Sequence, residues 1–299
     1  SWQGARSRAE AFLELDLPAI LDLPGFTLDL FSVGLAPDHW LRVFALMFGR
    51  ASFLPDAENR HSFHDRALRE TRKWEAKVAE GLSEQVFDTV YPALVEAIAN
   101  SLAETSGSRG IAGSALEDVR RSALTLLYRL LFVLYAEDRR LLPVDHDAYA
   151  VYSLDRIRED IAERLDRNEV LSDRIGTRYD TIRNLFAAID KGDPKLGLPP
   201  YNGGLFDAAD HGLLDRIRLP DSVMAVVVDT LSRREESGRR LRINYRDLSV
   251  QQLGSIYERL LEFAVVADED RIVRIQPSPF ARKNSGSYYT PDELVRLIV

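Results

Sequence analysis

The sequence predicts a mainly α-helical fold, a multi-helix bundle with a short β element near the C-terminus. Apolar residues recur at spacings of three and four along most of the chain, which is the period of an amphipathic helix. Glycine, serine and proline gather between these stretches, where turns and loops are expected. The run 271–275 alternates polar and apolar residues over the length of a strand and is the best strand candidate.

Residues 1–104 predict an N-terminal helical region. Short apolar clusters mixed with turn formers open the chain, and helices are expected at 39–52, 63–82 and 83–104. The second is dense in charge and has a narrow core face. The third places one apolar stripe on a single face, with Pro92 as its one interruption. The glycine- and serine-rich run 105–114 then predicts an exposed loop.

Residues 115–265 predict a central helical spacer domain. Its first helix, expected at 115–142 and ended by Pro143, is apolar on all sides in its middle, which is typical of a helix at the centre of a bundle. Further helices are expected at 155–167, 179–191, 221–236 and 249–264. Ser249 and Gln252 have the spacing of a capping box at the start of the last one.

Composition and charge restrict the function classes. The chain has 299 residues, no cysteine and a formal net charge of -8. The lack of cysteine excludes disulfides, thiolate zinc sites and a cysteine nucleophile. The acidic balance argues against nucleic-acid binding over the whole surface but leaves a local DNA-facing patch open. The sequence has no apolar run long enough to span a bilayer and no signal-peptide pattern, so we expect no membrane partner and a cytoplasmic location.

Arginines form the candidate DNA-facing patch, because their guanidinium groups suit bidentate phosphate contacts. The candidate contacts are Arg233, Arg234, Arg239, Arg240 and Arg242. The alternative is that they flank a solvated helix end beside Glu235 and Glu236.

Asp56, Glu75 and Lys77 have the residue types of the PD-(D/E)xK pattern of metal-dependent nucleases. That chemistry needs carboxylates around Mg²⁺ and a lysine near the attacking water, with the Glu-x-Lys on a strand. Here the Glu-x-Lys lies in a charged helical pattern, so a nuclease fragment remains a minor alternative. His61 and His64 have no evident third metal ligand, so we expect them in surface or packing roles.

The segment 286–299 begins Gly-Ser-Tyr-Tyr-Thr-Pro and predicts a helix start. Thr290 has the position of an N-cap, Pro291 that of the first helical residue, and Glu293 completes a capping box. A free helix N-terminus offers backbone N–H groups to a small anion, although any capped helix does so.

The same motif resembles the opening of the catalytic domain in gamma-class amino-methyltransferases. The runs 127–132, 201–207 and 253–263 are similar to the helical region that precedes this motif in type IIG restriction-modification enzymes, and similar regions occur in the large methyltransferases of the BREX and DISARM phage-exclusion systems. The resemblance covers about 83–299. Together with the strand predicted at 271–275, it makes 266–299 a strand followed by the truncated start of a methyltransferase domain.

The resemblance implies an adenine-N6 DNA methyltransferase that uses S-adenosylmethionine, with Tyr289, Thr290 and Pro291 as cofactor contacts. The implied partners are double-stranded DNA, a methyltransferase domain and a target-recognition domain. The family's Asn-Pro-Pro-Tyr/Phe catalytic motif and its glycine-rich cofactor loop lie downstream of the Tyr-Thr-Pro motif and do not occur in this sequence. We therefore expect a catalytically inert spacer fragment that does not bind the cofactor stably by itself. A helical protein-interaction scaffold without an enzyme parent is the other alternative.

Overall fold

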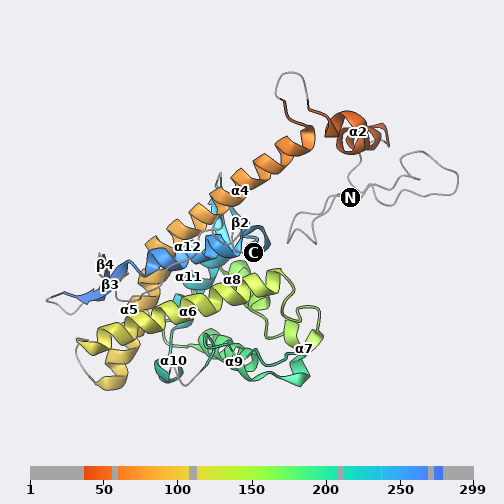
Figure 1. Cartoon of the computed structure of the whole chain (residues 1–299). Coiled ribbons are helices and arrows are strands. Elements are labelled where there is room, and N and C mark those ends of the chain that lie inside the picture. The colour runs from red at the N-terminus through yellow and green to blue at the C-terminus, as the bar shows by residue number, and fades with distance from the viewer. Residues whose placement is uncertain are drawn as a thin grey trace. The chain divides into compact units, whose positions relative to one another are not determined.

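The computed structural model describes residues 37–55, 60–107, 113–201, 203–207, 212–236, 238–268 and 273–278. It confirms a mainly α-helical fold with short β elements in the C-terminal part (Figure 1). The chain divides into two compact units, Ser1–Val78 and Ala79–Val299, and the division falls within one helix. The expected domain boundaries at 104 and 265 stay predictions.

In the first unit, α2 (Pro37–Phe48) and α3 (Arg50–Phe53) replace the single helix expected at 39–52. The break falls at Gly49, whose backbone is extended, with ψ of 148°, while its N–H still donates to the carbonyl of Ala45 at 2.9 Å. A Cβ at this position would collide with the Ala45 carbonyl oxygen. Glycine therefore permits a break that other residues would obstruct.

The next two predicted helices form one nearly continuous helical path. Helix α4 (Phe63–Gln85) passes through a π-helical turn, η2 (Val86–Val90), into α5 (Tyr91–Ser106). Pro92 lies just after this turn. Proline lacks the N–H of a regular helical bond and its ring crowds the preceding turn, so a widened turn ahead of it avoids a full break.

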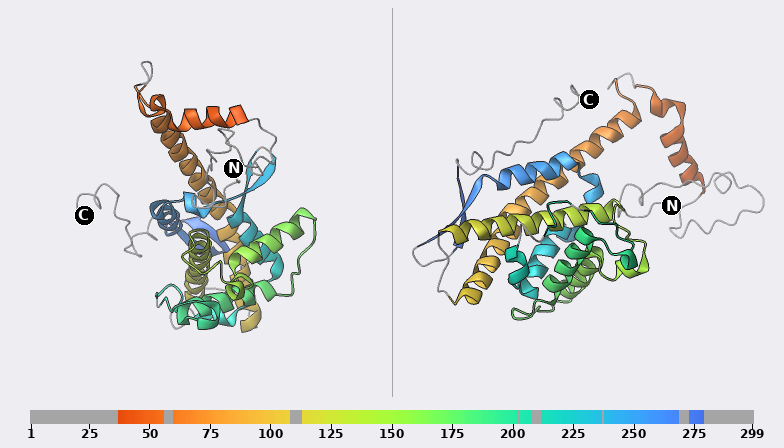
Figure 2. Two further views of the ribbon diagram at one scale, coloured as in Figure 1. Left: turned by 90° about the vertical axis from the view of Figure 1, so that its right-hand side faces the viewer. Right: turned by 60° about the horizontal axis from the view of Figure 1, so that its bottom comes forward.

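Helix α6 (Ser114–Asp138) lies in the middle of the second unit, as its all-round apolarity predicted. It packs against α5, α8 (Leu154–Asp166), α10 (Gly212–Arg216) and α12 (Val250–Leu260) (Figure 2). The helix ends at Asp138, four residues before the expected end. Arg140 adopts a φ of 56° and the N–H of Leu141 donates back to the carbonyl of Ala136, which is a Schellman-type end.

The remaining helices surround this centre. They are α7 (Asp147–Ala150), α9 (Thr177–Lys191), α11 (Asp221–Ser232) and the 3-10 turns η3 (Pro194–Leu196) and η4 (Tyr245–Asp247). The helices predicted at 155–167 and 179–191 correspond to α8 and α9 within two residues. The predicted capping box is confirmed, because Ser249 Oγ accepts from the N–H of Gln252 and Gln252 Oε1 accepts from the N–H of Ser249.

Two antiparallel β ladders correct the predicted ends of two helices. The helix expected to reach 236 ends at Ser232, and β1 (Arg233–Glu236) pairs with β2 (Arg239–Arg242). The helix expected to reach 264 ends at Leu260, and β3 (Phe263–Ala267) pairs with β4 (Val273–Pro277). Strand β4 overlaps the predicted strand. Its partner was missed because its apolar residues continue a helical pattern in sequence.

Among the residues that the structure describes, no helix is both long enough and apolar enough to cross a bilayer.

Candidate functional site

The five candidate DNA-contacting arginines lie on one β hairpin that begins at the end of α11, where Arg233 is the C-cap. Arg233 and Arg234 belong to β1, and Arg239, Arg240 and Arg242 belong to β2. The register places Arg233 opposite Arg242, and the two glutamates of β1 opposite Arg239 and Arg240. Opposite charges across an antiparallel pair favour this register.

Ion pairs within the protein hold Arg233 and Arg240. The guanidinium of Arg233 lies 2.7 Å from Asp166 Oδ1 and 2.5 Å from Asp229 Oδ1, and its side chain is largely buried. Arg240 Nη1 lies 3.1 Å from Asp229 Oδ2. Asp229 on α11 therefore connects its own helix to both strands, while Asp166 at the end of α8 adds a second anchor.

Arg242 joins a charge network between α6 and α8. In the centre of this network Arg158 Nη2 lies 2.6 Å from Asp138 Oδ1, and the two side chains are only 3% and 4% exposed. Arg158 Nε donates to Asp155 Oδ1 at 2.8 Å, and Arg242 donates to the same oxygen. The N–H of Tyr245 donates to Asp138 Oδ2 at 2.9 Å. The network thus joins α6, α8 and the end of the hairpin.

Burial and charge act in opposite directions on Arg158. Burial alone would lower the pKa of its guanidinium, but the carboxylates of Asp138 and Asp155 outweigh burial and raise that pKa. Breaking one side of such a buried pair costs about 3 to 5 kcal/mol, because it leaves an uncompensated charge. Loss of Asp138 or Arg158 would therefore leave a buried charge without its partner, and this pair holds α6 against α8.

Glu137 is a second buried acid beside this network. Its Oε1 accepts from Tyr149 Oη and from the N–H of Leu154, both at 2.8 Å, and its Oε2 accepts from the N–H of Asp155 at 2.7 Å. The carboxyl thus caps the N-terminus of α8, where unpaired N–H groups favour an acceptor. Burial raises the pKa of Glu137 to about 7, and the hydrogen bonds together with Arg158 oppose the rise.

These contacts give most of the hairpin arginines a structural role. Arg234 Nη2 also pairs with Glu236 Oε2 at 2.7 Å. Arg239 is exposed, and no partner is found for it among the described residues. Phosphate contact by Arg233 or Arg242 would require opening internal ion pairs, whereas Arg239 is open to solvent. DNA binding by the hairpin stays a prediction.

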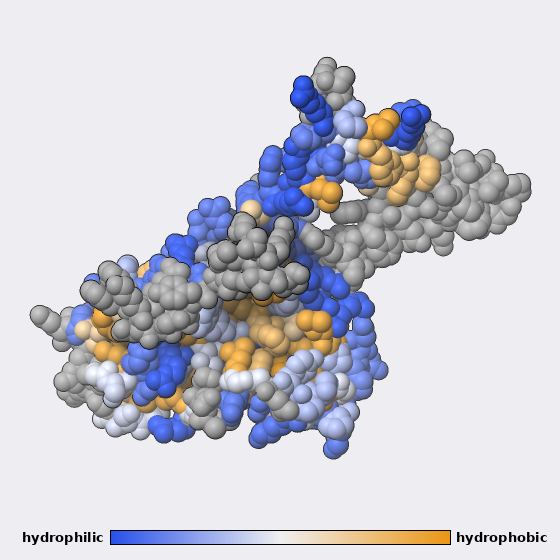
Figure 3. Space-filling model, viewed as in Figure 1, coloured by the Kyte–Doolittle hydropathy of each residue, from blue (hydrophilic) through white to orange (hydrophobic). Residues whose placement is uncertain are grey.

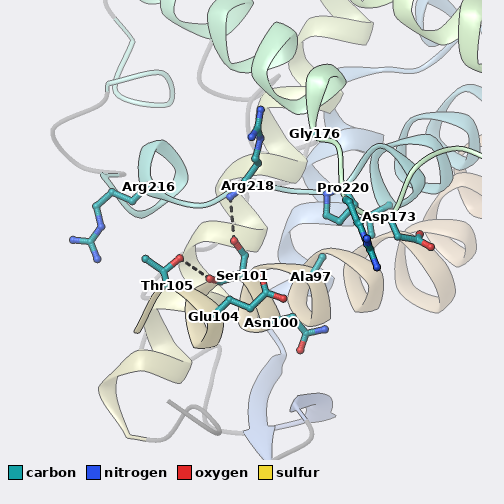
Figure 4. A pocket seen from close by; sticks show the side chains of 12 residues that line it. Ala97, Asn100, Ser101, Glu104, Thr105, Asp173, Gly176, Arg216, Arg218 and Pro220 are labelled. Atoms are coloured by element: carbon teal, nitrogen blue, oxygen red, sulfur yellow. Dashed lines mark hydrogen bonds between the residues drawn. The ribbon is translucent and has the colours of Figure 1, made fainter. Parts of the chain in front are cut away.

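A polar cleft of about 500 Å³ lies between α5 and the loops before α9 and α11. Arg218 N donates to Ser101 Oγ at 3.0 Å and joins the two walls (Figure 4). The side chains of Arg216 and Arg218 point away from each other in this view, and carboxylates of Glu104 and Asp173 also line the cleft. The mixed charge and the divergent arginines provide no convergent anion site.

The remaining predicted positions contribute no assembled site. Tyr289, Thr290 and Pro291, the candidate cofactor contacts, lie outside the described residues, as does Asp56 of the nuclease pattern. Glu75 and Lys77 lie in helix α4, which confirms their helical context. The described part of the chain contains no group of three histidine or acidic residues placed to hold a metal ion.

His64 has the packing role expected from the sequence. Its ring stacks on Phe53 with centroids 4.4 Å apart, and its Nε2 lies 2.7 Å from the carbonyl oxygen of Met47. These contacts help pack α3 against the start of α4 within the first unit.

Sequence reasoning missed the acidic partners of the arginines. Asp229 lies four residues before Arg233, a spacing that the sequence already showed. Asp166 and Asp155 lie 67 and 87 residues from their arginine partners, so only the tertiary structure brings them together.

Comparisons with protein-family models, with curated proteins and with solved structures find no match to this chain.

Proposed function

We propose that this chain is the helical spacer of a DNA adenine-N6 methyltransferase of the restriction-modification or phage-defence type. The spacer positions an S-adenosylmethionine-dependent catalytic domain relative to an upstream region and to duplex DNA. The methyltransferase assignment rests on the sequence resemblance of the runs 127–132, 201–207 and 253–263 and of the Tyr-Thr-Pro motif. Catalysis itself is assigned to residues that this sequence does not contain.

The structural observation that supports a spacer is the anchoring of the segment before the Tyr-Thr-Pro motif. At its start, Arg139 Nη2 donates to the carbonyls of Arg246 and Leu248, both at 3.1 Å. In the middle, the rings of Tyr128 on α6 and Tyr257 on α12 contact with centroids 4.5 Å apart. The segment is thus held at two points along α6.

The end of α12 and the β3–β4 ladder are anchored as well. Arg120 Nε donates to the carbonyl of Phe263 at 3.0 Å, and the ring of Phe263 lies 5.2 Å from that of Phe87. Strand β3 packs against α6, and β4 packs against α5 (Figure 2). A domain that follows β4 would therefore start from a fixed point on the bundle, which is what a positioning spacer requires.

The test is methyl transfer by the native polypeptide. An antibody raised against this chain would isolate the native polypeptide from its source cells. The isolated polypeptide would then be assayed for methyl transfer with radiolabelled S-adenosylmethionine and unmethylated duplex DNA. We expect a polypeptide longer than 299 residues that forms N6-methyladenine, whereas the purified 299-residue chain forms none. A native polypeptide that carries no methyltransferase activity would refute the proposal and favour the scaffold alternative.

A further inference from the structure

A basic helical surface lies at the start of α4, in the first unit. Arg66, Arg69, Lys73 and Lys77 are spaced by three, four and four residues, so their side chains share one face of the helix. These four residues are called the basic stripe below. All four are exposed, and the helix surface in this region is predominantly hydrophilic (Figure 3).

The local charge differs in sign from that of the whole chain. Residues 63–77 contain five basic and three acidic residues, whereas the whole chain has a formal net charge of -8. Positive charge gathered on one helix face of an acidic protein is the electrostatic footprint expected of a local polyanion site.

Two residues of the stripe, Arg69 and Lys73, make contacts within the protein that are open to solvent, and Lys77 Nζ lies 5.9 Å from the ring centroid of Trp74. Lys73 Nζ pairs with Glu70 Oε1 at 2.7 Å, but the two side chains are 72% and 70% exposed. Such exposed pairs contribute only about 0 to 1 kcal/mol. Arg69 Nε reaches the carbonyl of Asp65 at 3.4 Å, which is a long hydrogen bond. Unlike the largely buried Arg233, Arg69 and Lys73 can turn to a phosphate at little cost.

Duplex DNA fits the stripe better than an anionic membrane does. The stripe extends from Arg66 to Lys77, which is about 16 Å of helix, and B-DNA presents one charge for about every 1.7 Å of its axis. A helix also fits the major groove, which is about 12 Å wide. A membrane-surface helix needs a continuous apolar face, and Glu75 interrupts the side opposite the stripe between Thr71 and Val78.

We propose that the basic stripe of α4 binds the phosphates of duplex DNA. The proposal rests on the proposed function, because it names the surface through which the spacer contacts the DNA that the parent enzyme methylates. In sequence, Lys77 of this stripe matched only the nuclease pattern, and the candidate DNA contacts were the hairpin arginines.

The experiment measures binding of the 299-residue chain to fluorescently labelled duplex DNA over a series of salt concentrations. The test variant is R66Q/R69Q/K73Q, and the matched control is R121Q/K191Q/K195Q, which removes the same charge from exposed positions of the second unit. Glutamine is a good helix former, so α4 should persist. Circular dichroism and the urea midpoint check that both variants fold as the wild type does.

We expect the test variant to lose affinity about tenfold or more at low salt, and the slope of log affinity against log salt to fall by about 2 to 3. The control should bind within about twofold of the wild type, because it retains every assigned phosphate contact. Equal losses in both variants, unchanged binding of the test variant, or no binding by the wild-type chain would each overturn the proposal. Preferential binding to vesicles of anionic lipid over DNA would overturn it as well.

The two proposals fail in distinguishable ways. If the native polypeptide methylates DNA and the test variant still binds normally, the stripe assignment is wrong and the proposed function stands. If the native polypeptide has no methyltransferase activity, the proposed function is wrong whatever the binding data show.

Discussion

Glu137 makes the stability of this protein dependent on pH in a defined direction. Its carboxyl is buried at the N-terminus of α8 and accepts three hydrogen bonds, and the charge of Arg158 acts to lower its pKa. Burial raises its pKa from the ordinary value of 4.5 to about 7. The folded protein therefore holds the proton more tightly than the unfolded chain does.

The direction and the size of the pH effect on stability follow from the difference between the folded and unfolded pKa of Glu137. A group whose pKa is higher in the folded state contributes stability that is complete below its unfolded pKa and is lost as the pH rises through its folded pKa. A tenfold change in proton affinity corresponds to about 1.4 kcal/mol. The rise from 4.5 to about 7 therefore predicts that Glu137 lowers the free energy of unfolding by about 3 kcal/mol over this range.

The assay is urea unfolding followed by circular dichroism at several pH values from about 5 to about 8. The variant E137Q replaces the carboxyl with a neutral amide, so its free energy of unfolding should fall less over this range than that of the wild type. The control E163Q removes a carboxyl that is 71% exposed and should retain the wild-type slope.

Parallel pH dependences for the wild type and E137Q would refute the reasoning. A wild type that gains stability relative to E137Q as the pH rises would also contradict it. That result would mean that the three hydrogen bonds and Arg158 outweigh burial and keep the carboxyl ionised in the folded state.

Three further substitutions test the packing directly, each by the urea midpoint. Tyr245→Phe removes the hydroxyl that donates to the carbonyl of Leu231 at 2.8 Å, and leaving this buried acceptor unpaired should cost about 1 to 3 kcal/mol of stability. An unchanged urea midpoint would mean that this hydrogen bond does not stabilise the fold. Ser249→Ala removes the N-cap of α12 and should cost about 1 kcal/mol, while Ser249→Gly should cost less. Leu127→Ala opens a cavity in the centre of α6 and should cost about 2 to 5 kcal/mol, so a cost well below this range would mean that α6 is not central.

The sequence alone was sufficient to predict the helical class and the position of α6 at the centre of the bundle. Apolar periodicity is a local property, and it determines which face of a helix must be buried. An all-round apolar stretch leaves no face for water, so within a helical bundle it is expected at the centre. The capping box at Ser249 was also predictable, because its donors and acceptors lie within four residues of one another.

The β hairpins could not be predicted from local sequence patterns. Arg233 and its neighbours continue the pattern of α11, yet they form a strand because Asp166 and Asp229 hold Arg233 and because β2 supplies the ladder. Strand formation depends on a partner, so propensity along the chain does not decide it.

The roles of the arginines were likewise decided only by the tertiary structure. In sequence the hairpin is the densest arginine cluster, with five arginines in 233–242, whereas the stripe on α4 has only two arginines and two lysines between Arg66 and Lys77. Folding brings Asp138 and Asp155 against Arg242, more than 80 residues away, and leaves Arg69 and Lys73 in water. The physical reason is that the availability of a cation depends on the charges that surround it in space.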